Sequence, residues 1–211
     1  IWDYLAYLVD EQRVADGRAM MQRHAATLRA VEARYGVDRH VVAAVWGVES
    51  DYGKAAGDDF LPHALATLVC AGESRREFWR KELMAALQLV SRGDLELDEL
   101  YGSWAGAFGH TQFIPTTYQR HAVDFDGDGR RDLVKSIPDA LASTANYLRR
   151  SGWRSGEAWM LEVKVRPGYA GPRGRRAYAT LADWGNRGAL RADGARLQGR
   201  TLAGLILPAG A

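Results

Sequence analysis

Most of this sequence carries the apolar spacing of helices, and that spacing changes near its end. From Glu11 to Arg150, apolar residues recur at intervals of three and four in segments that end at glycines. Apolar and polar residues then alternate over 160–166, as in a strand, and 202–207 is a second strand candidate. The change predicts a mostly helical α+β protein with a small mixed α+β domain over 157–211. The helices that we expect cover about 11–35, 38–53, 63–69, 74–90, 137–150 and 180–187.

Composition and charge indicate a globular protein with no nucleic-acid partner and no intramolecular disulfide. With 211 residues, 47% of them hydrophobic, the chain can bury one substantial core and a smaller second one. Its 28 Lys and Arg are balanced by 26 Asp and Glu and are scattered, so we expect no nucleic-acid partner. Cys70 is the single cysteine and cannot form an intramolecular disulfide, and its apolar neighbours predict that it is buried.

The ends of the chain suggest part of a longer precursor. The sequence begins at Ile1 without a methionine or a signal-like segment, and no run approaches the roughly 20 apolar residues that span a bilayer. We therefore expect any export signal or membrane anchor to lie in a segment outside this sequence.

Glu49 is the ionisable residue that the helical pattern singles out. Val42, Val45 and Trp46 belong to the apolar row of the predicted 38–53 helix, with Trp46 in the core, and Glu49 is the next member of that row. This spacing predicts a carboxylate aimed inward in the last turn, where the helix dipole and loss of water both raise its pKa. A protonated Glu at neutral pH is a general acid. The alternative is a side chain that reaches solvent past Ser50.

An acidic loop predicts a metal site. Asp124, Asp126, Asp128 and Asp132 occupy positions 1, 3, 5 and 9 of an EF-hand-like loop that has a glycine at position 6. Position 12 is Lys135 where a bidentate Glu is expected, so we expect either an inactive site or closure by a later acid.

Asp139 is the candidate for that late acid. A competing interpretation is that Ser136 and Asp139 form a capping box for the helix that follows, and both roles are compatible. We expect the ion to pin a turn, because nothing else in the sequence indicates metal catalysis.

Four segments together resemble the lytic murein transglycosylase B family. They are Glu49 followed by Ser-Asp-Tyr-Gly, the glycine-rich aromatic run 102–118, the acidic loop, and Ala-Asn-Tyr-Leu-Arg-Arg-Ser-Gly-Trp at 145–153. They occur in the family's order and approximate spacing, and the similarity covers nearly the whole chain. The resemblance implies a lysozyme-like core, an additional α domain and a small β domain.

The resemblance also implies domain limits, a location and an activity. It makes 1–35 part of the α domain, 36–141 the lysozyme-like catalytic core with the EF-hand-like loop at 124–139, 142–156 a helix returning to the α domain, and 157–211 the small mixed domain. Such enzymes act on the glycan strands of peptidoglycan, in the periplasm or cell envelope of a bacterium. They cut between N-acetylmuramic acid and N-acetylglucosamine and leave a 1,6-anhydromuramoyl end. The family continues past the β domain into a segment with a Tyr-Asn motif that helps to close the active site, and that segment is not in this sequence.

Site residues follow from the same resemblance. Glu49 becomes the catalytic acid and base, and Ca²⁺ a structural ion. The implied glycan-groove residues are Ser103, Gln112 and Phe113, with Tyr147 beside the carboxylate, Arg75 and Arg76 near the peptide and glycan subsites, and Tyr4 at the rim. The implied calcium ligands are Asp124, Asp126, Asp128, the carbonyl of Arg130, and Asp139.

The residues leave three mechanisms open. Glycoside hydrolysis normally uses two carboxylates, and Asp51, Asp58 and Asp59 show no pattern that points them toward Glu49. A single Glu is enough if the C6 hydroxyl of the substrate closes the anhydro ring. The rivals are a lysozyme-like hydrolase that uses Asp58 or Asp59 with water, and a non-catalytic, calcium-stabilised peptidoglycan-binding module. His63 and His110 share no metal-ligand spacing and are expected at the surface or at helix caps.

Overall fold

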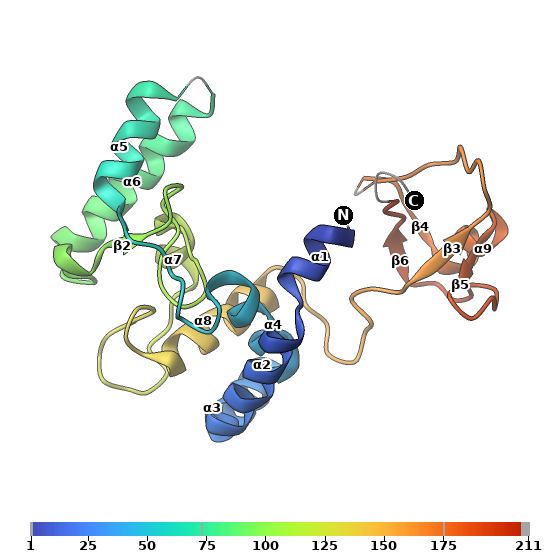
Figure 1. The fold of residues 1–211 in the computed structure, drawn as a ribbon, viewed down its shortest axis with the longest axis horizontal. Helices are drawn as coiled ribbons and strands as arrows, with labels where there is room; N and C mark the ends of the chain where they lie inside the picture. The colour runs from blue at the N-terminus through green and yellow to red at the C-terminus, as the bar shows by residue number, and fades with distance from the viewer. Residues whose placement is uncertain (1, 73, 175, 208–211) are drawn as a thin grey trace. The chain divides into compact units, whose positions relative to one another are not determined.

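The computed structural model describes residues 2–72, 74–174 and 176–207. The chain divides into two compact units, one over 4–155 and the other formed from 156 onward together with the first residues of the chain. The fold is mostly helical with small two-stranded sheets, which confirms the predicted α+β class (Figure 1). Within the described residues, no helix has both the length and the apolar character that a membrane span requires.

The larger unit is built from helices around two cores. Its helices are α1 (Trp2–Leu8), which enters this unit at Tyr4, α2 (Glu11–Arg23), α3 (Ala25–Tyr35), α4 (Arg39–Ser50), α5 (Leu61–Ala71), α6 (Arg76–Ser91), the 3₁₀ turn η1 (Leu97–Glu99), α7 (Pro115–His121) and α8 (Ile137–Arg150). Two short strands, β1 (Asp59–Phe60) and β2 (Tyr101–Gly102), pair antiparallel.

Trp46 lies at the centre of the first core. It is 1% exposed and packs with buried residues of α3 and α8, which lie against α4. The second core joins α6 and α7 to the glycine-rich run through Phe108, Phe113 and Tyr118. The second core thus contains residues of the run itself, whereas the first core contains Trp46 of α4.

Several predicted helices differ from the observed ones. The expected 11–35 helix is two helices, because the backbone leaves helical geometry at His24, whose ring packs edge-on against Trp46 at 5.5 Å between centroids. The pattern also missed α1 and α7, each of which has only seven residues. Helix α8 matches its predicted limits, 137–150.

Cys70 contradicts its prediction. Its side chain is exposed, because α5 buries Leu61 and Leu65 and turns the end of the helix outward. An apolar neighbourhood in sequence therefore did not place this residue in a core.

The second unit is a small mixed domain around Trp184. Strand β3 (Val163–Val165) pairs with β5 (Ala189–Arg191), and β4 (Tyr178–Thr180) pairs with β6 (Leu202–Gly204), both antiparallel. Helix α9 (Leu181–Asn186) lies between β4 and β5 and begins with a capping box of Thr180 and Asp183. The predictions of β3, β6 and α9 are confirmed, whereas β4 and β5 were missed because three-residue strands give little alternation to detect.

Candidate active site and metal site

Helix α4 carries Glu49 in its last turn. The helix begins where the carboxylate of Asp38 accepts a hydrogen bond of 2.7 Å from the backbone N–H of His40, and it ends at Asp51, whose φ is 49°. The predicted limits of this helix are confirmed.

Glu49 itself is exposed, so the prediction of an inward-facing side chain was wrong. The buried face of α4 consists of Val42, Ala43, Trp46, Gly47 and Ser50. At 3.6 residues per turn, Glu49 lies roughly a quarter turn from the centre of that face. The side chain therefore stands at the edge of the buried stripe.

Partial burial nevertheless raises the pKa of Glu49, as expected. Burial is the cause, and no neighbouring charge or hydrogen bond of the described residues contributes. The carboxylate is thus partly shielded from water and has no compensating partner. That is the environment in which a Glu retains its proton to higher pH than usual.

Ser50 connects the end of α4 to the glycine-rich run. Its Oγ donates a hydrogen bond of 2.6 Å to the carbonyl oxygen of His110 and accepts one of 2.9 Å from the N–H of Gly53. Trp46 Nε1 donates to His110 Nδ1 at 3.1 Å. His110 is therefore a partly buried residue that joins two elements, and its prediction as a surface or capping residue was wrong, whereas His63 is exposed as predicted.

The glycine-rich run packs closely against the protein itself. A Cβ at Gly102 would overlap the carbonyl oxygen of Ala107, and one at Gly109 would lie 2.5 Å from the carbonyl oxygen of Leu133. Gly109 also has a φ of 73°, which side chains disfavour. The glycines are therefore needed for close approach to other backbone segments of the protein.

Two predicted groove residues, Ser103 and Gln112, shape this run. Ser103 Oγ accepts a hydrogen bond of 3.1 Å from the N–H of Ala107. Gln112 has a φ of 52°, and its Nε2 donates to the carbonyl oxygens of Ala56 at 2.8 Å and Gly109 at 3.1 Å. Since both amide hydrogens are used within the protein, the side-chain oxygen of Gln112 is the atom left for a ligand.

Phe113 and Tyr147 meet edge-on. Their ring centroids are 5.9 Å apart, and the ring of His121 also lies edge-on to Tyr147 at 5.2 Å between centroids. Phe113 is buried, whereas Tyr147 is 39% exposed. The pair thus has an aromatic surface that faces solvent, which a core pair would not have.

Arg75, Arg76 and Tyr4 are all exposed. Arg75 precedes α6 with a φ of 59°, and its guanidinium lies 4.1 Å from the ring centroid of Phe78. Tyr4 is on α1 and is 63% exposed. The structure does not join these three to Glu49 by any hydrogen bond, ion pair or ring contact among the described residues.

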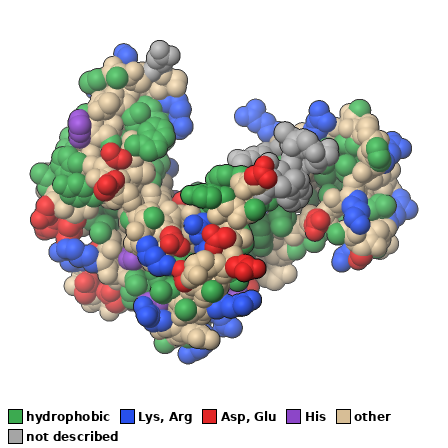
Figure 2. Space-filling model, viewed as in Figure 1, with side chains coloured by type: hydrophobic (Ala, Val, Ile, Leu, Met, Phe, Trp, Pro, Cys, Tyr) green, Lys and Arg blue, Asp and Glu red, His purple; other side chains and the backbone are tan. Residues whose placement is uncertain are grey.

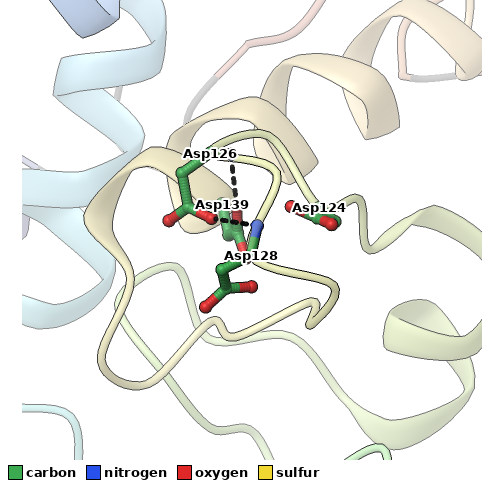
Figure 3. Close-up of side chains that lie close together, drawn as sticks. All are labelled: Asp124, Asp126, Asp128 and Asp139. Carbon is green, nitrogen blue, oxygen red and sulfur yellow. Dashed lines mark hydrogen bonds between the residues drawn. The ribbon is translucent and has the colours of Figure 1, made fainter.

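The acidic loop folds its carboxylates together. One carboxylate oxygen from each of Asp124, Asp126, Asp128 and Asp139 lies within 4.8 Å of the others, although the residues come from both the loop and the first turn of α8 (Figure 3). Asp139 is fully buried, and the other three are partly or largely exposed. Four oxygen ligands at this separation could hold a hard cation such as Ca²⁺.

Asp139 is directed at the loop. It accepts hydrogen bonds from the backbone N–H groups of Phe125 at 2.7 Å and Asp132 at 2.8 Å. Ser136 Oγ caps α8 through the N–H of Asp139, but the returning bond of a capping box is not made. Ser136 instead donates to Asp126 at 2.6 Å. Burial raises the pKa of Asp139 despite these backbone donors.

Asp132 and Lys135 have other roles. Asp132 accepts from the N–H groups of Val134 and Lys135, both at 2.8 Å, and so stabilises the turn that leads into α8. Lys135 forms an ion pair with Glu99 of η1. Position 12 of the loop thus ties the loop to a neighbouring segment.

Three other acids were candidates for a second catalytic carboxylate beside Glu49. Asp51 forms ion pairs with Arg13 at 3.7 Å and Lys54 at 3.6 Å. Asp58 and Asp59 are exposed, and Asp59 lies in β1 opposite Gly102. Among the described residues, no hydrogen bond or ion pair therefore joins a second carboxylate to Glu49.

Comparison with known proteins assigns the family. The model of the transglycosylase SLT domain matches residues 1–211. The chain belongs to the SLT-domain transglycosylases. It is 32% identical over 154 residues to membrane-bound lytic murein transglycosylase B of Escherichia coli strain K12, which is 73% of this chain and 42% of that protein.

Solved structures of SLT-domain relatives share the fold. The crystal structure of SltB3 from Pseudomonas aeruginosa in complex with NAG-NAM-pentapeptide has a TM-score of 0.91 and 44% identity, over 99% of this chain and 57% of that one. SltB3 has also been solved with NAG-anhNAM-pentapeptide. Slt35 from Escherichia coli in complex with calcium has a TM-score of 0.86 and 28% identity, over 97% of this chain and 64% of that one. The chain thus spans less than two thirds of these relatives.

Sequence reasoning missed one buried acid of this SLT domain. Glu82 on α6 is 1% exposed and accepts hydrogen bonds from both the N–H and the hydroxyl of Thr116, at the start of α7. The helical pattern of α6 gave no reason to separate Glu82 from the polar residues on its solvent face. The signal available was Ile114 at the N-cap position before Pro115, because an apolar side chain cannot accept hydrogen bonds from the N–H groups of the first turn.

Proposed function

We propose that the protein is a peptidoglycan lytic transglycosylase in which Glu49 acts as general acid and then as general base. The observation that carries this proposal is the environment of Glu49: its pKa is raised by burial, it has no carboxylate partner among the described residues, and Ser50 beside it holds the glycine-rich run. Membership of the SLT-domain family supports it. SltB3, with 44% identity, was solved with muropeptides of both the NAM and the anhNAM form.

In this mechanism protonated Glu49 gives its proton to the glycosidic oxygen between N-acetylmuramic acid and N-acetylglucosamine. The bond to the muramoyl C1 breaks, and the oxocarbenium-like state is stabilised by the substrate's N-acetyl group and nearby dipoles. Glu49, now a carboxylate, takes the proton of the C6 hydroxyl as that oxygen bonds to C1. The products are a free GlcNAc end and a 1,6-anhydromuramoyl end.

The groove residues orient the sugar and exclude water. We assign Ser103 and Gln112 to the N-acetyl group, because both sit in the run that Ser50 joins to α4. Tyr147, packed against the buried ring of Phe113, offers an exposed aromatic ring on which a sugar face can stack. Exclusion of water favours ring closure over hydrolysis. Arg75, Arg76 and Tyr4 are proposed as more distant contacts with stem peptide and glycan.

We further propose that the acidic loop holds a structural Ca²⁺. Its ligands are Asp124, Asp126, Asp128, the carbonyl of Arg130, and Asp139. The convergence of the four carboxylates supports this site, and the relative Slt35 was crystallised with calcium. Through Asp139 the ion would fix the loop against α8, which also carries Tyr147.

The domain assignment and location complete the proposal. Residues 36–141 form the lysozyme-like core, 1–35 and 142–156 the α domain, and 157–211 the small mixed domain. The glycan strands of peptidoglycan are the partner, in the periplasm or cell envelope of a bacterium. The relative from Escherichia coli is membrane-bound, and we propose that this protein is likewise attached to a membrane.

Mass spectrometry of the soluble products from purified peptidoglycan sacculi tests the function. Wild type is expected to release anhydromuropeptides that Glu49→Gln does not release. Products that carry an added water would support the hydrolase. No products from wild type, together with intact binding to sacculi, would support the binding module.

A further inference from the structure

The ring of His110 is held in one neutral tautomer. An indole N–H can only donate, so the hydrogen bond of 3.1 Å from Trp46 Nε1 makes His110 Nδ1 an acceptor. An accepting Nδ1 carries no proton, which leaves the hydrogen on Nε2. Trp46 is 1% exposed and packed on three sides by the rings of His24, Tyr52 and His110, so it has little room to turn away.

The same residue holds the groove loop, which we define as residues 109–113. The His110 carbonyl receives the Ser50 hydroxyl at 2.6 Å, and the His110 N–H donates to Leu133 at 2.9 Å. The ring lies so close to Gly53 that a Cβ there would overlap it. Gln112, two residues later, has a φ of 52°, which costs energy for a residue other than glycine. A strained Gln112 requires firm support, and His110 supplies contacts through ring and backbone.

We propose that His110 is a positioning residue that aligns the groove loop with the helix carrying Glu49 only while its ring is neutral. This inference rests on the proposed function, because the loop carries Gln112 and Phe113. Protonation would place an Nδ1–H against the N–H of Trp46. Two donors cannot share that position, so the ring and the loop would move away from α4.

The groups around His110 favour the neutral ring. Burial lowers its pKa, and the nearby His24 lowers it further, while Asp132 opposes both. His110 also lines a cavity of about 360 Å³ with the charged side chains of Asp98, Glu99 and Lys135. Because the folded-state pKa is lowered, the contribution of His110 to stability is present above its ordinary pKa of 6.5 and is lost as pH falls through the lowered value.

The activity test is the pH profile of kcat/KM on solubilised glycan strands. His110→Asn retains an acceptor for Trp46 but does not titrate, so it is expected to keep activity near neutral pH within about twofold and to lose the acid-side fall of the wild type. His110→Phe removes the acceptor and is expected to lower kcat/KM about tenfold at every pH, because groove residues are misplaced. His63→Gln, at an exposed histidine, is the matched control and should keep the wild-type profile.

A direct measurement tests the ring without using activity. Nitrogen-15 NMR of the His110 ring should show an unprotonated Nδ1 and a protonated Nε2 near neutral pH, and the amide signals of Gly53 and Gln112 should titrate with it in wild type but not in His110→Asn. Trp46→Phe should abolish the tautomer preference. A protonated Nδ1 near neutral pH, or an acid-side fall that persists unchanged in His110→Asn, would overturn the proposal. If wild type releases no products at any pH, the proposed function fails while the NMR result still decides the role of His110.

Discussion

The carboxylate of Glu82 on α6 caps the first turn of α7 through Thr116. The carboxylate accepts a hydrogen bond of 2.9 Å from the backbone N–H of Thr116 and one of 2.8 Å from its hydroxyl, and Glu82 is 1% exposed. Helix α7 has no side-chain cap of its own at Ile114. A residue 34 positions earlier thus fixes the helix that follows the groove loop.

Glu82→Ala is therefore expected to destabilise the protein by about 2–3 kcal/mol, because it removes two hydrogen bonds and leaves a buried N–H unpaired. Urea denaturation followed by circular dichroism measures the change. Glu77→Ala, at the exposed start of the same helix, is the control and should cost less than about 0.5 kcal/mol. Equal effects of the two variants would show that Glu82 is not a cap.

Removal of calcium is expected to lower stability. Calcium at about 100 times its Kd adds about 2.7 kcal/mol to a protein that binds it only when folded. Thermal unfolding with calcium or with a chelator gives the difference, and calorimetric titration gives the affinity. Asp126→Asn should weaken calcium binding, whereas Asp98→Asn, an exposed acid outside the cluster, should not. Unchanged affinity in Asp126→Asn would remove the loop from the proposed site.

The pH dependence of turnover should report Glu49. The acid form starts the reaction, so kcat/KM is expected to fall as pH rises through the raised pKa of Glu49, above its ordinary value of 4.5. Folding stability depends on pH in the same direction. The folded state favours the uncharged form of Glu49, so the contribution of Glu49 to the free energy of unfolding is lost as pH rises through that pKa. Glu49→Gln should thus lose activity. Its free energy of unfolding should exceed that of wild type at pH 7 but not at pH 4. A variant that is less stable at pH 7 would contradict the partial burial of Glu49.

Tyr147 is expected to control water at the reacting carbon. Aromatic pairs such as Phe113 and Tyr147 contribute about 0.5–1.5 kcal/mol beyond the area that they bury. Tyr147→Ala should lower kcat/KM by up to about tenfold and raise the fraction of products that carry added water, whereas Tyr147→Phe should keep the ring and most of both properties. Mass spectrometry of the products measures the ratio. An unchanged ratio in Tyr147→Ala would show that the ring does not exclude water.

Replacement of Asp58 or Asp59 separates the transglycosylase from the hydrolase. Both side chains are exposed, and the proposed mechanism gives them no role. Asp58→Asn and Asp59→Asn should each retain at least half of the wild-type rate of product release from sacculi. A loss of a hundredfold or more in either variant would support a second catalytic carboxylate.

The sequence by itself determined the helical character, the limits of α4 and α8 and the acidic loop, because these features depend on local spacing, capping and turn chemistry. Asp38 before α4 and Gly152 after α8 are local signals of that kind. The motifs that resemble the family also lie within short segments.

The tertiary structure decided what those residues contact. Spacing placed Glu49 on the apolar row, but only packing against neighbouring helices fixed which side of α4 is buried, and that left Glu49 at its edge. The break at His24, the cap from Glu82 and the link from Trp46 to His110 all involve contacts between segments far apart in the chain. The exposure of Cys70 depends on which face of α5 is buried. Such contacts depend on three-dimensional packing, and no local pattern of apolar and polar residues encodes them.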